Sequence, residues 1–219
     1  MFRVTRTRPA PASLASRKSY SEEDVLVELR KIFYEKCYLC ESRSLVHLNV
    51  EHLKPHKNKN KALKFDWNNL FYVCSRCNNF KRAKYTNILD CTDHSIDVLR
   101  SIKHLPPVSP FAKLNITAET TCPQTIQTAE LINNIFNSDD TPNKTVAGAE
   151  LRYNVFVAIN YLNTLFLAYI NPKTSIRKKL EFLEELQTLA GKEQEFSAFI
   201  RWTIFGDERL SAILLPYVD

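Results

Sequence analysis

Two pairs of cysteines with the spacing Cys-x-x-Cys constrain this chain more than any other feature of its sequence. Cys37 and Cys40 form the first pair, Cys74 and Cys77 form the second, and 33 residues lie between them. Four thiolates complete the tetrahedral shell of a zinc ion and leave no position for water or substrate. The spacing therefore predicts a structural zinc site that joins the two ends of an inserted unit. Ordinary buried or redox-active thiols are the alternative.

Whether these thiols bind metal or form disulfides depends on the cellular compartment. Residues 1–8 contain arginines but no apolar core long enough for a secretory signal, so we expect a cytoplasmic protein, in which paired thiols favour metal over disulfides. Cys91 and Cys122 lack the paired spacing and are expected to be small buried hydrophobic residues. The most apolar stretch, residues 151–170, includes Arg152 and three asparagines. We therefore expect a buried helix there and no membrane association.

Hydrophobic periodicity divides the chain into a short basic segment, a mixed region and a helical region. Residues 1–20 are basic and interrupted by prolines, so we expect an extended N-terminal arm that runs over a surface or a partner. Helical spacing of apolar residues begins at Ser21 and continues to about Lys36. The mixed region that follows is expected to contain strands at 45–50 and 70–73 and a short helix at 75–84.

The second half of the chain is expected to be helical. Four prolines within residues 104–125 indicate an irregular linker. Beyond it, apolar residues three and four apart predict helices at about 125–137, 145–170, 175–190, 193–205 and 207–215. The expected fold is mainly α, with a small zinc-braced α+β unit and a helical C-terminal domain. The expected divisions are an arm at 1–20, a domain at 21–105, a linker at 106–124 and a helical domain at 125–219.

The charge is distributed unevenly between the two halves. Residues 1–110 contain 20 lysines and arginines against 11 acids, whereas residues 111–219 contain 10 against 13. All five histidines lie in the basic half. We therefore expect only the first half to contact phosphate groups. With three glycines in the chain, a glycine-rich phosphate-binding loop is not expected, and the chain is not expected to be an ATPase by itself.

A set of polar residues between and just after the cysteine pairs resembles a known nuclease motif. In chain order they are Val50-Glu51-His52-Leu53-Lys54-Pro55, then Trp67-Asn68-Asn69-Leu70, then Cys77-Asn78-Asn79-Phe80-Lys81. Their order and spacing resemble the HNH nuclease motif, a ββα-metal finger, in the subclass that two Cys-x-x-Cys pairs brace. The resemblance covers residues 37–81 and implies an endonuclease that hydrolyses phosphodiester bonds.

The chemistry of that reaction explains the residue types. A histidine titrates close enough to neutral pH to take a proton from the attacking water, so we expect His52 to be the general base. Glu51 and Asn78 offer oxygen ligands for a hard catalytic cation. By resemblance, the amide oxygen of Asn69 orients the histidine. A structural histidine in place of a base is the alternative for His52.

Two departures from the family pattern affect the expected metal. Many members have histidine where this chain has Asn78, and a neutral oxygen ligand suits Mg²⁺ or Mn²⁺ better than zinc. The acid before the histidine is more often aspartate, whereas Glu51 is one methylene longer. We therefore expect Zn²⁺ at the cysteines and Mg²⁺ or Mn²⁺ at the catalytic site.

Basic residues surround the motif. We expect Lys54, Lys57, Lys81 and Arg82 to contact nucleic acid backbone, with an affinity that falls steeply with salt. A solvated lysine loop is the alternative. His56 is expected at the surface or in contact with substrate. We favour DNA as the substrate, with tRNA or another RNA as the alternative, although the basic and aromatic residues do not distinguish the two.

A narrower resemblance covers about the first 100 residues. It is carried by the proline-containing basic N-terminus, Tyr20-Ser-Glu-Glu, Phe65-Asp-Trp-Asn-Asn-Leu-Phe-Tyr-Val-Cys and Tyr85-Thr-Asn-Ile-Leu-Asp. These segments resemble the HNH nuclease subunits of Septu-type and retron-associated bacterial anti-phage systems. The resemblance implies a defence complex with an ATPase of the ABC/SMC type. The alternatives are a non-catalytic zinc-braced subunit that binds nucleic acid, and a subunit that scaffolds the ATPase through its C-terminal helices.

Overall fold

The chain folds into two units. The computed structural model describes residues 1–43, 48–82 and 84–218. Unit 1 comprises Met1–Ile102 and Thr117–Ile135, and unit 2 comprises Lys103–Ile116 and Phe136–Asp219. The proline-rich stretch that the sequence indicates as a linker contributes residues to both units. The division of the chain into an arm, two domains and a linker stays a prediction.

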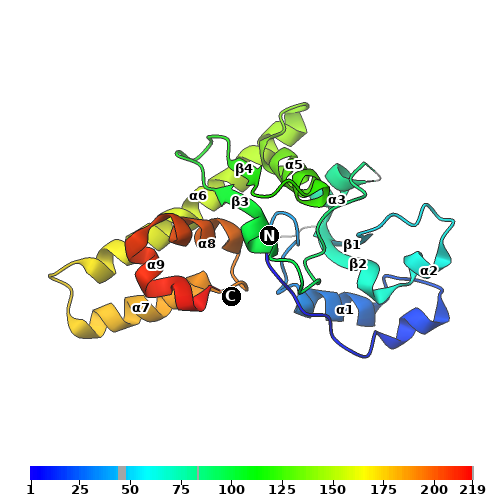
Figure 1. The fold of residues 1–219 in the computed structure, drawn as a ribbon, viewed down its shortest axis with the longest axis horizontal. Coiled ribbons are helices and arrows are strands. Elements are labelled where there is room, and N and C mark those ends of the chain that lie inside the picture. Colours follow the sequence, from blue (N-terminus) through cyan, green and yellow to red (C-terminus); the bar gives the residue numbers. More distant parts are fainter. Residues whose placement is uncertain (44–47, 83, 219) are drawn as a thin grey trace. The chain divides into compact units, whose positions relative to one another are not determined.

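The centre of unit 1 is a ββα finger, as the sequence predicts. Strand β1 (Leu48–His52) pairs antiparallel with β2 (Leu70–Cys74), so that Glu51 lies opposite Phe71 and His52 opposite Leu70. Helix α3 (Ser75–Lys81) follows β2 without a loop and packs against both strands (Figure 1). Residues 45–47 of the expected first strand, which include His47, lie outside the described residues.

Helix α1 (Glu23–Ile32) packs against β2. Glu23 and Asp24 occupy its first turn and Arg30 and Lys31 its last, an arrangement that complements the helix dipole. The helix begins two residues after the expected Ser21 and ends four residues before Lys36. It ends early because Tyr34 has a positive φ of 55°, which is incompatible with a right-handed helix.

The N-terminal segment, which the sequence predicts as an extended arm over a surface or a partner, begins with residues that pack into unit 1. Met1, Phe2 and Val4 are buried, and the Val4 amide donates to the Cys91 carbonyl at 3.0 Å. The guanidinium of Arg6 lies 4.6 Å from the ring centre of Phe71. Apolar and cationic residues both find partners inside the unit, which composition and proline content alone could not indicate. A short 3₁₀ helix, η1 (Ala12–Ser16), precedes α1.

Several short elements lie in stretches where the sequence carries no periodic signal. They are α2 (Lys61–Lys64), η2 (Trp67–Asn69), α4 (Val98–Ser101), β3 (Ile102–Leu105) and β4 (Asn115–Ala118). β3 and β4 form a second two-stranded sheet. β4 lies inside the expected proline-rich linker, so that segment is not wholly irregular.

The long helices agree closely with the expected ones. They are α5 (Pro123–Asn137), α6 (Pro142–Ile170), α7 (Ile176–Ala190), α8 (Ser197–Gly206) and α9 (Glu208–Leu214), followed by η3 (Leu215–Tyr217). Helix α6 begins three residues early because the Thr141 hydroxyl caps it and Pro142 is suited to the first turn. In unit 2, α7 lies alongside α6, and α8 packs against α6, α7 and α9 (Figure 1).

Helix α6 is buried on one face rather than all round. Arg152 is buried, and its guanidinium donates to the carbonyls of Phe111 at 3.1 Å and Phe136 at 2.7 Å. Tyr153 and Val157 on the same helix are exposed. By length and composition this is the one helix of the described chain that could cross a bilayer, a test that core helices of soluble proteins also pass.

Candidate active site

The four paired cysteines come together at the base of the finger. The sulfur atoms of Cys37, Cys40, Cys74 and Cys77 all lie within 4.8 Å of one another. Cys74 ends β2, and its sulfur accepts the Cys77 amide of α3 at 3.4 Å. A tetrahedral zinc ion with Zn–S bonds of about 2.3 Å fits inside such a cluster. The cluster therefore suggests zinc and fits the predicted zinc-braced ββα finger.

The four thiols also perturb one another's pKa values. Hydrogen bonds with neighbouring thiols raise the pKa of Cys40 well above its usual range, and burial does the same for Cys77. The pKa of Cys74 is lowered because its sulfur accepts hydrogen bonds from the other thiols. Four thiolates cannot be ionised together here unless a metal offsets their charge. Of the two remaining cysteines, Cys91 is buried as expected, whereas Cys122 is exposed, contrary to expectation.

A pocket of about 300 Å³ opens beside the end of β1. Its lining residues are Tyr20, Val50, Glu51, His52, Pro55, His56, Lys57, Asn58, Asn78, Lys81 and Arg82. Among the expected site residues, Glu51, His52 and Asn78 are thus brought together, with Lys57, Lys81 and Arg82. Asn69 and Lys54 do not line the pocket.

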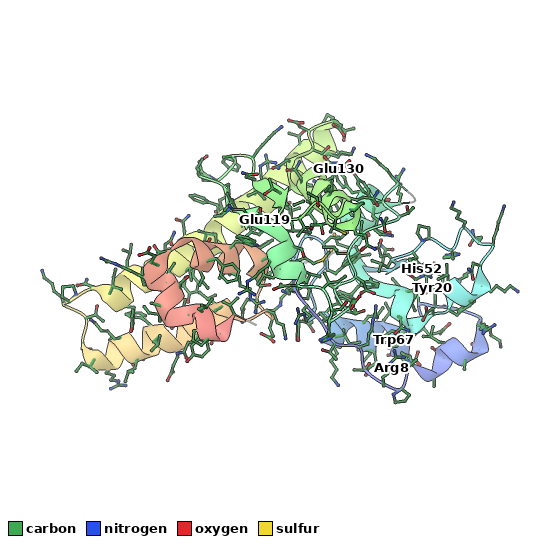
Figure 2. All side chains as sticks on the ribbon, viewed as in Figure 1. Arg8, Tyr20, His52, Trp67, Glu119 and Glu130 are labelled. Atoms are coloured by element: carbon green, nitrogen blue, oxygen red, sulfur yellow. The ribbon has the colours of Figure 1, made fainter. Side chains whose placement is uncertain are left out.

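The imidazole of His52 is held by a single backbone group. Its Nε2 atom lies 3.0 Å from the carbonyl oxygen of Lys64. A carbonyl only accepts, so Nε2 carries the proton in the neutral ring and Nδ1 keeps the lone pair. The ring packs edge-on against Tyr20 with centroids 4.6 Å apart (Figure 2). Burial lowers the pKa of His52 below its usual value, so the ring is neutral at neutral pH and able to accept a proton.

Asn69 acts on the loop after β1 rather than on His52 itself. Its side-chain oxygen accepts the Lys54 amide at 2.7 Å, and its amide group donates to the carbonyls of Lys54 at 2.9 Å and Leu63 at 3.0 Å. The amide oxygen that we expected to orient the histidine accepts the Lys54 amide instead, so any effect of Asn69 on His52 is indirect. The side chain holds the two ends of the loop, and the residue after Leu63 supplies the carbonyl that holds His52.

Glu51 and Lys81 form a buried ion pair in the wall of the pocket. Glu51 is 4% exposed, and its Oε1 atom accepts the hydroxyl of Tyr38 and lies 3.5 Å from the Lys81 amine. The same amine donates to the His52 carbonyl at 2.8 Å. Burial raises the pKa of Glu51 to about 7, although Lys81 and Tyr38 both oppose that shift.

The burial of Lys81 changes its expected role. The sequence places this lysine on the same face of α3 as Asn78 and suggests a contact with backbone phosphate. The structure leaves the residue 1% exposed, with its amine bonded to β1. Withdrawing that amine toward a phosphate would leave Glu51 without its cation, at a cost of several kcal/mol. Lys81 therefore fixes α3 to β1 instead of binding backbone phosphate.

Other basic residues remain on the surface. Lys54, Lys57 and Arg82 are exposed. Lys57 and Arg82 line the pocket, and both have positive φ angles, 50° and 40°. Trp67 and Tyr72, which lie among the basic residues in the sequence, are buried core residues. Sequence reasoning misses the contacts of Tyr20 with His52 and of Tyr38 with Glu51, because neither tyrosine belongs to the HNH motif.

Comparison with known proteins identifies part of the chain. A family model described as HNH endonuclease matches residues 37–84, which is 48 of the 219 residues. No protein of curated function matches the chain, and no solved structure matches it. The matched segment contains both cysteine pairs, β1, β2 and α3. Residues 37–84 are therefore an HNH endonuclease domain that contains a four-cysteine cluster.

Proposed function

We propose that the chain is a metal-dependent HNH endonuclease that hydrolyses phosphodiester bonds in nucleic acid, with DNA favoured over RNA. The observation that supports this most is the environment of His52. Its Nε2–H is committed to a carbonyl, its Nδ1 keeps a lone pair, and it shares one pocket with Glu51 and Asn78. This combination provides a base and two oxygen ligands within reach of one phosphate.

In this mechanism His52 Nδ1 removes the proton from the attacking water. The Lys64 carbonyl stabilises the imidazolium that results, because Nε2–H donates more strongly when the ring is charged. Mg²⁺ or Mn²⁺ held by Glu51 and Asn78 would polarise the phosphoryl oxygens and stabilise the leaving oxygen. Since Oε1 of Glu51 is engaged by Tyr38 and Lys81, its other oxygen is the one suited to a cation.

Two further residues position the reactive groups. Asn69 holds the loop that supplies the Lys64 carbonyl, and Lys81 ties α3, which carries Asn78, to the strand that carries Glu51 and His52. The exposed Lys54, Lys57 and Arg82 would contact the backbone phosphates. Such contacts read little sequence, and they make affinity fall as salt rises.

The resemblance over the first 100 residues supports a narrower proposal. We propose that this chain is the nuclease subunit of a cytoplasmic bacterial anti-phage system and works with an ATPase of the ABC/SMC type. The cysteine cluster and the His52 pocket both lie in unit 1, and we propose that the partner docks on unit 2. If His52 has lost its catalytic role, the chain is a zinc-braced binding or scaffolding subunit instead.

The decisive experiment is a cleavage assay with a matched pair of variants. Protein with and without the ATPase and nucleotide is incubated with duplex DNA, single-stranded DNA and tRNA in Mg²⁺ or Mn²⁺. We expect His52→Ala to lose cleavage and keep binding, whereas His94→Ala, an exposed histidine of the same unit that does not line the pocket, cleaves normally. Wild-type protein inert under all these conditions would favour the non-catalytic alternative.

A further inference from the structure

A second histidine lies in the same pocket and has no role in the mechanism so far. The ring of His56 is 4.3 Å from that of His52 and 6.4 Å from that of Tyr20, centroid to centroid. Both histidines line the pocket, which also contains Glu51 and Asn78. His56 follows Pro55 near the start of the loop after β1, whereas Lys64 lies near the end of that loop. The two residues therefore approach the site from opposite ends of the loop.

The loop around His56 fixes which ring nitrogen carries the proton. The Asn58 amide donates to His56 Nδ1 at 3.0 Å. This bond requires the chain to turn back within two residues, and Lys57 and Asn58 both adopt left-handed φ angles, 50° and 55°, to make it. A backbone N–H only donates, so Nδ1 holds a lone pair and Nε2 carries the hydrogen in the neutral ring.

Hydrogen bonds also hold the backbone of His56. Its carbonyl oxygen accepts the amides of Lys59 at 3.0 Å and Asn60 at 3.1 Å. Left-handed backbone at non-glycine residues costs about 1 kcal/mol each, which the surrounding bonds must offset. The hydrogen bond at Nδ1 therefore favours one tautomer of the ring, and the bonds to the carbonyl hold the backbone that carries it.

The two histidines thus present opposite chemistry to one pocket. His52 directs its Nε2–H to the Lys64 carbonyl and keeps an acceptor at Nδ1. His56 directs its acceptor Nδ1 to the Asn58 amide and keeps a donor at Nε2. A protonated Nε2 does not bind a metal ion, so this tautomer favours a hydrogen-bond donor over a third ligand of the cation.

We propose that His56 is a substrate-binding catalytic residue, whose Nε2–H donates a hydrogen bond to a non-bridging oxygen of the phosphate that His52 activates water to attack. No proton is transferred by His56. Its fixed dipole stabilises negative charge as that charge grows on the phosphoryl oxygens, and no reorganisation is needed because the loop already holds the ring. This inference rests on the proposed nuclease function.

Single-turnover cleavage of duplex DNA at saturating protein tests the role directly. We expect His56→Ala to lower the rate constant about 10- to 100-fold, the range for loss of a hydrogen bond to a charged group. Duplex affinity, measured in the His52→Ala background, should change little. His56→Gln keeps an N–H donor and should recover part of the rate, whereas His94→Ala should match the wild type. Cleavage by His56→Ala at the wild-type rate would overturn the inference and leave the proposed nuclease intact.

A second measurement decides the question even if the isolated chain does not cleave. The imidazole nitrogens of ¹⁵N-histidine-labelled protein are followed by NMR as thymidine 3′,5′-bisphosphate is added. We expect the His56 Nε2 resonance to shift on binding and to remain protonated, with no such shift for His94. Binding that leaves the His56 resonances unmoved, or no saturable binding at the pocket, would exclude a phosphate contact by His56 whatever the outcome of the cleavage assay.

Discussion

The nitrogen of His52 that is left without a proton, and that we propose as the base, is set by a loop rather than by a neighbouring side chain. Lys64 O holds Nε2, and Asn69 holds the loop end that carries Lys64. Asn69 is buried and makes three hydrogen bonds to the backbone of that loop. Its side chain thus acts through the backbone, and the effect of its removal should exceed that of an ordinary buried asparagine.

Replacing Asn69 by alanine should therefore reduce both stability and activity. The change leaves one amide and two carbonyls without their partner, and we expect a loss of about 2–4 kcal/mol in the free energy of unfolding. At temperatures where the variant is still folded, we also expect cleavage to slow about 10- to 100-fold. A histidine that is displaced from the attacking water takes its proton less effectively. Asn68→Ala, at an exposed neighbouring position, is the control. A folded Asn69→Ala protein with normal cleavage would show that the loop does not position His52.

Because Glu51 is buried, its titration makes the free energy of unfolding depend on pH. Its pKa rises from 4.5 to about 7 in the folded protein. Between these values the folded protein keeps a proton that the unfolded chain has released, so this group's contribution to stability falls as pH rises from 4.5 to 7. Glutamine mimics the protonated acid and has no such dependence.

The Glu51→Gln variant should isolate this contribution. In zinc-loaded protein without Mg²⁺ or Mn²⁺, we expect the wild type to lose about 2 kcal/mol relative to the variant between pH 5.5 and 7.5. Denaturant unfolding of both proteins across that range measures the difference. Parallel curves would mean that the carboxylate is ionised throughout, with Lys81 offsetting its charge completely.

How far the site could be predicted differs among its residues. The motif predicts that Glu51, His52 and Asn78 act together, and the three residues do line one pocket because their spacing places them on adjacent elements. It could not show that the Lys81 amine turns inward, because a lysine on a short helix is consistent with either environment. Nor could it include Tyr20, since only tertiary packing brings that ring beside His52.

At the scale of elements, the long helices could be predicted and the short ones could not. α6 and α7 repeat their apolar residues over many turns, and Thr141 and Ser175 cap their first turns. β3 and β4 have four residues each, too few for an alternating pattern to stand out from chance. The N-terminal segment was unpredictable for a similar reason, because its buried residues follow no period.

The cysteine cluster joins three parts of the finger. Cys37 and Cys40 come from the turn after α1, Cys74 ends β2 and Cys77 lies in α3. A two-stranded sheet is marginal by itself in water, so we expect this cross-link to add to the stability that helix packing gives the finger. Metal binding to such a cluster is coupled to folding of the segment.

Loss of one cysteine should therefore unfold the finger selectively. We expect about one zinc per wild-type chain and none in Cys40→Ser, with loss of hydrogen-exchange protection across residues 37–84 and most of the helical circular dichroism retained. Cys122→Ser removes an exposed thiol outside the cluster and should keep both zinc and protection. Zinc-free wild-type protein that keeps full protection in this region would contradict a structural role for the metal.

At the scale of the whole molecule, the excess of basic residues and the candidate site lie in the same half of the chain. The first 110 residues carry 20 lysines and arginines against 11 acids, and they contain the described pocket with His52 as well as the cysteine cluster. Helix α6 of unit 2 instead exposes Tyr153, Val157 and Tyr161. These residues are four apart and so lie on one face of the helix. Exposed apolar side chains in such a row are more typical of a protein contact than of a nucleic acid contact.

If an ATPase docks on unit 2, a charge on this face should separate partner binding from nuclease chemistry. Val157 is 46% exposed, so Val157→Glu is tolerated by the fold, and we expect it to abolish co-purification of the ATPase while duplex binding by the finger is unchanged. Lys173→Glu, an exposed position in the turn after α6, is the matched control and should keep the partner. Co-purification that survives Val157→Glu would place the docking surface elsewhere, and a wild-type chain that captures no ATPase would refute the partner itself.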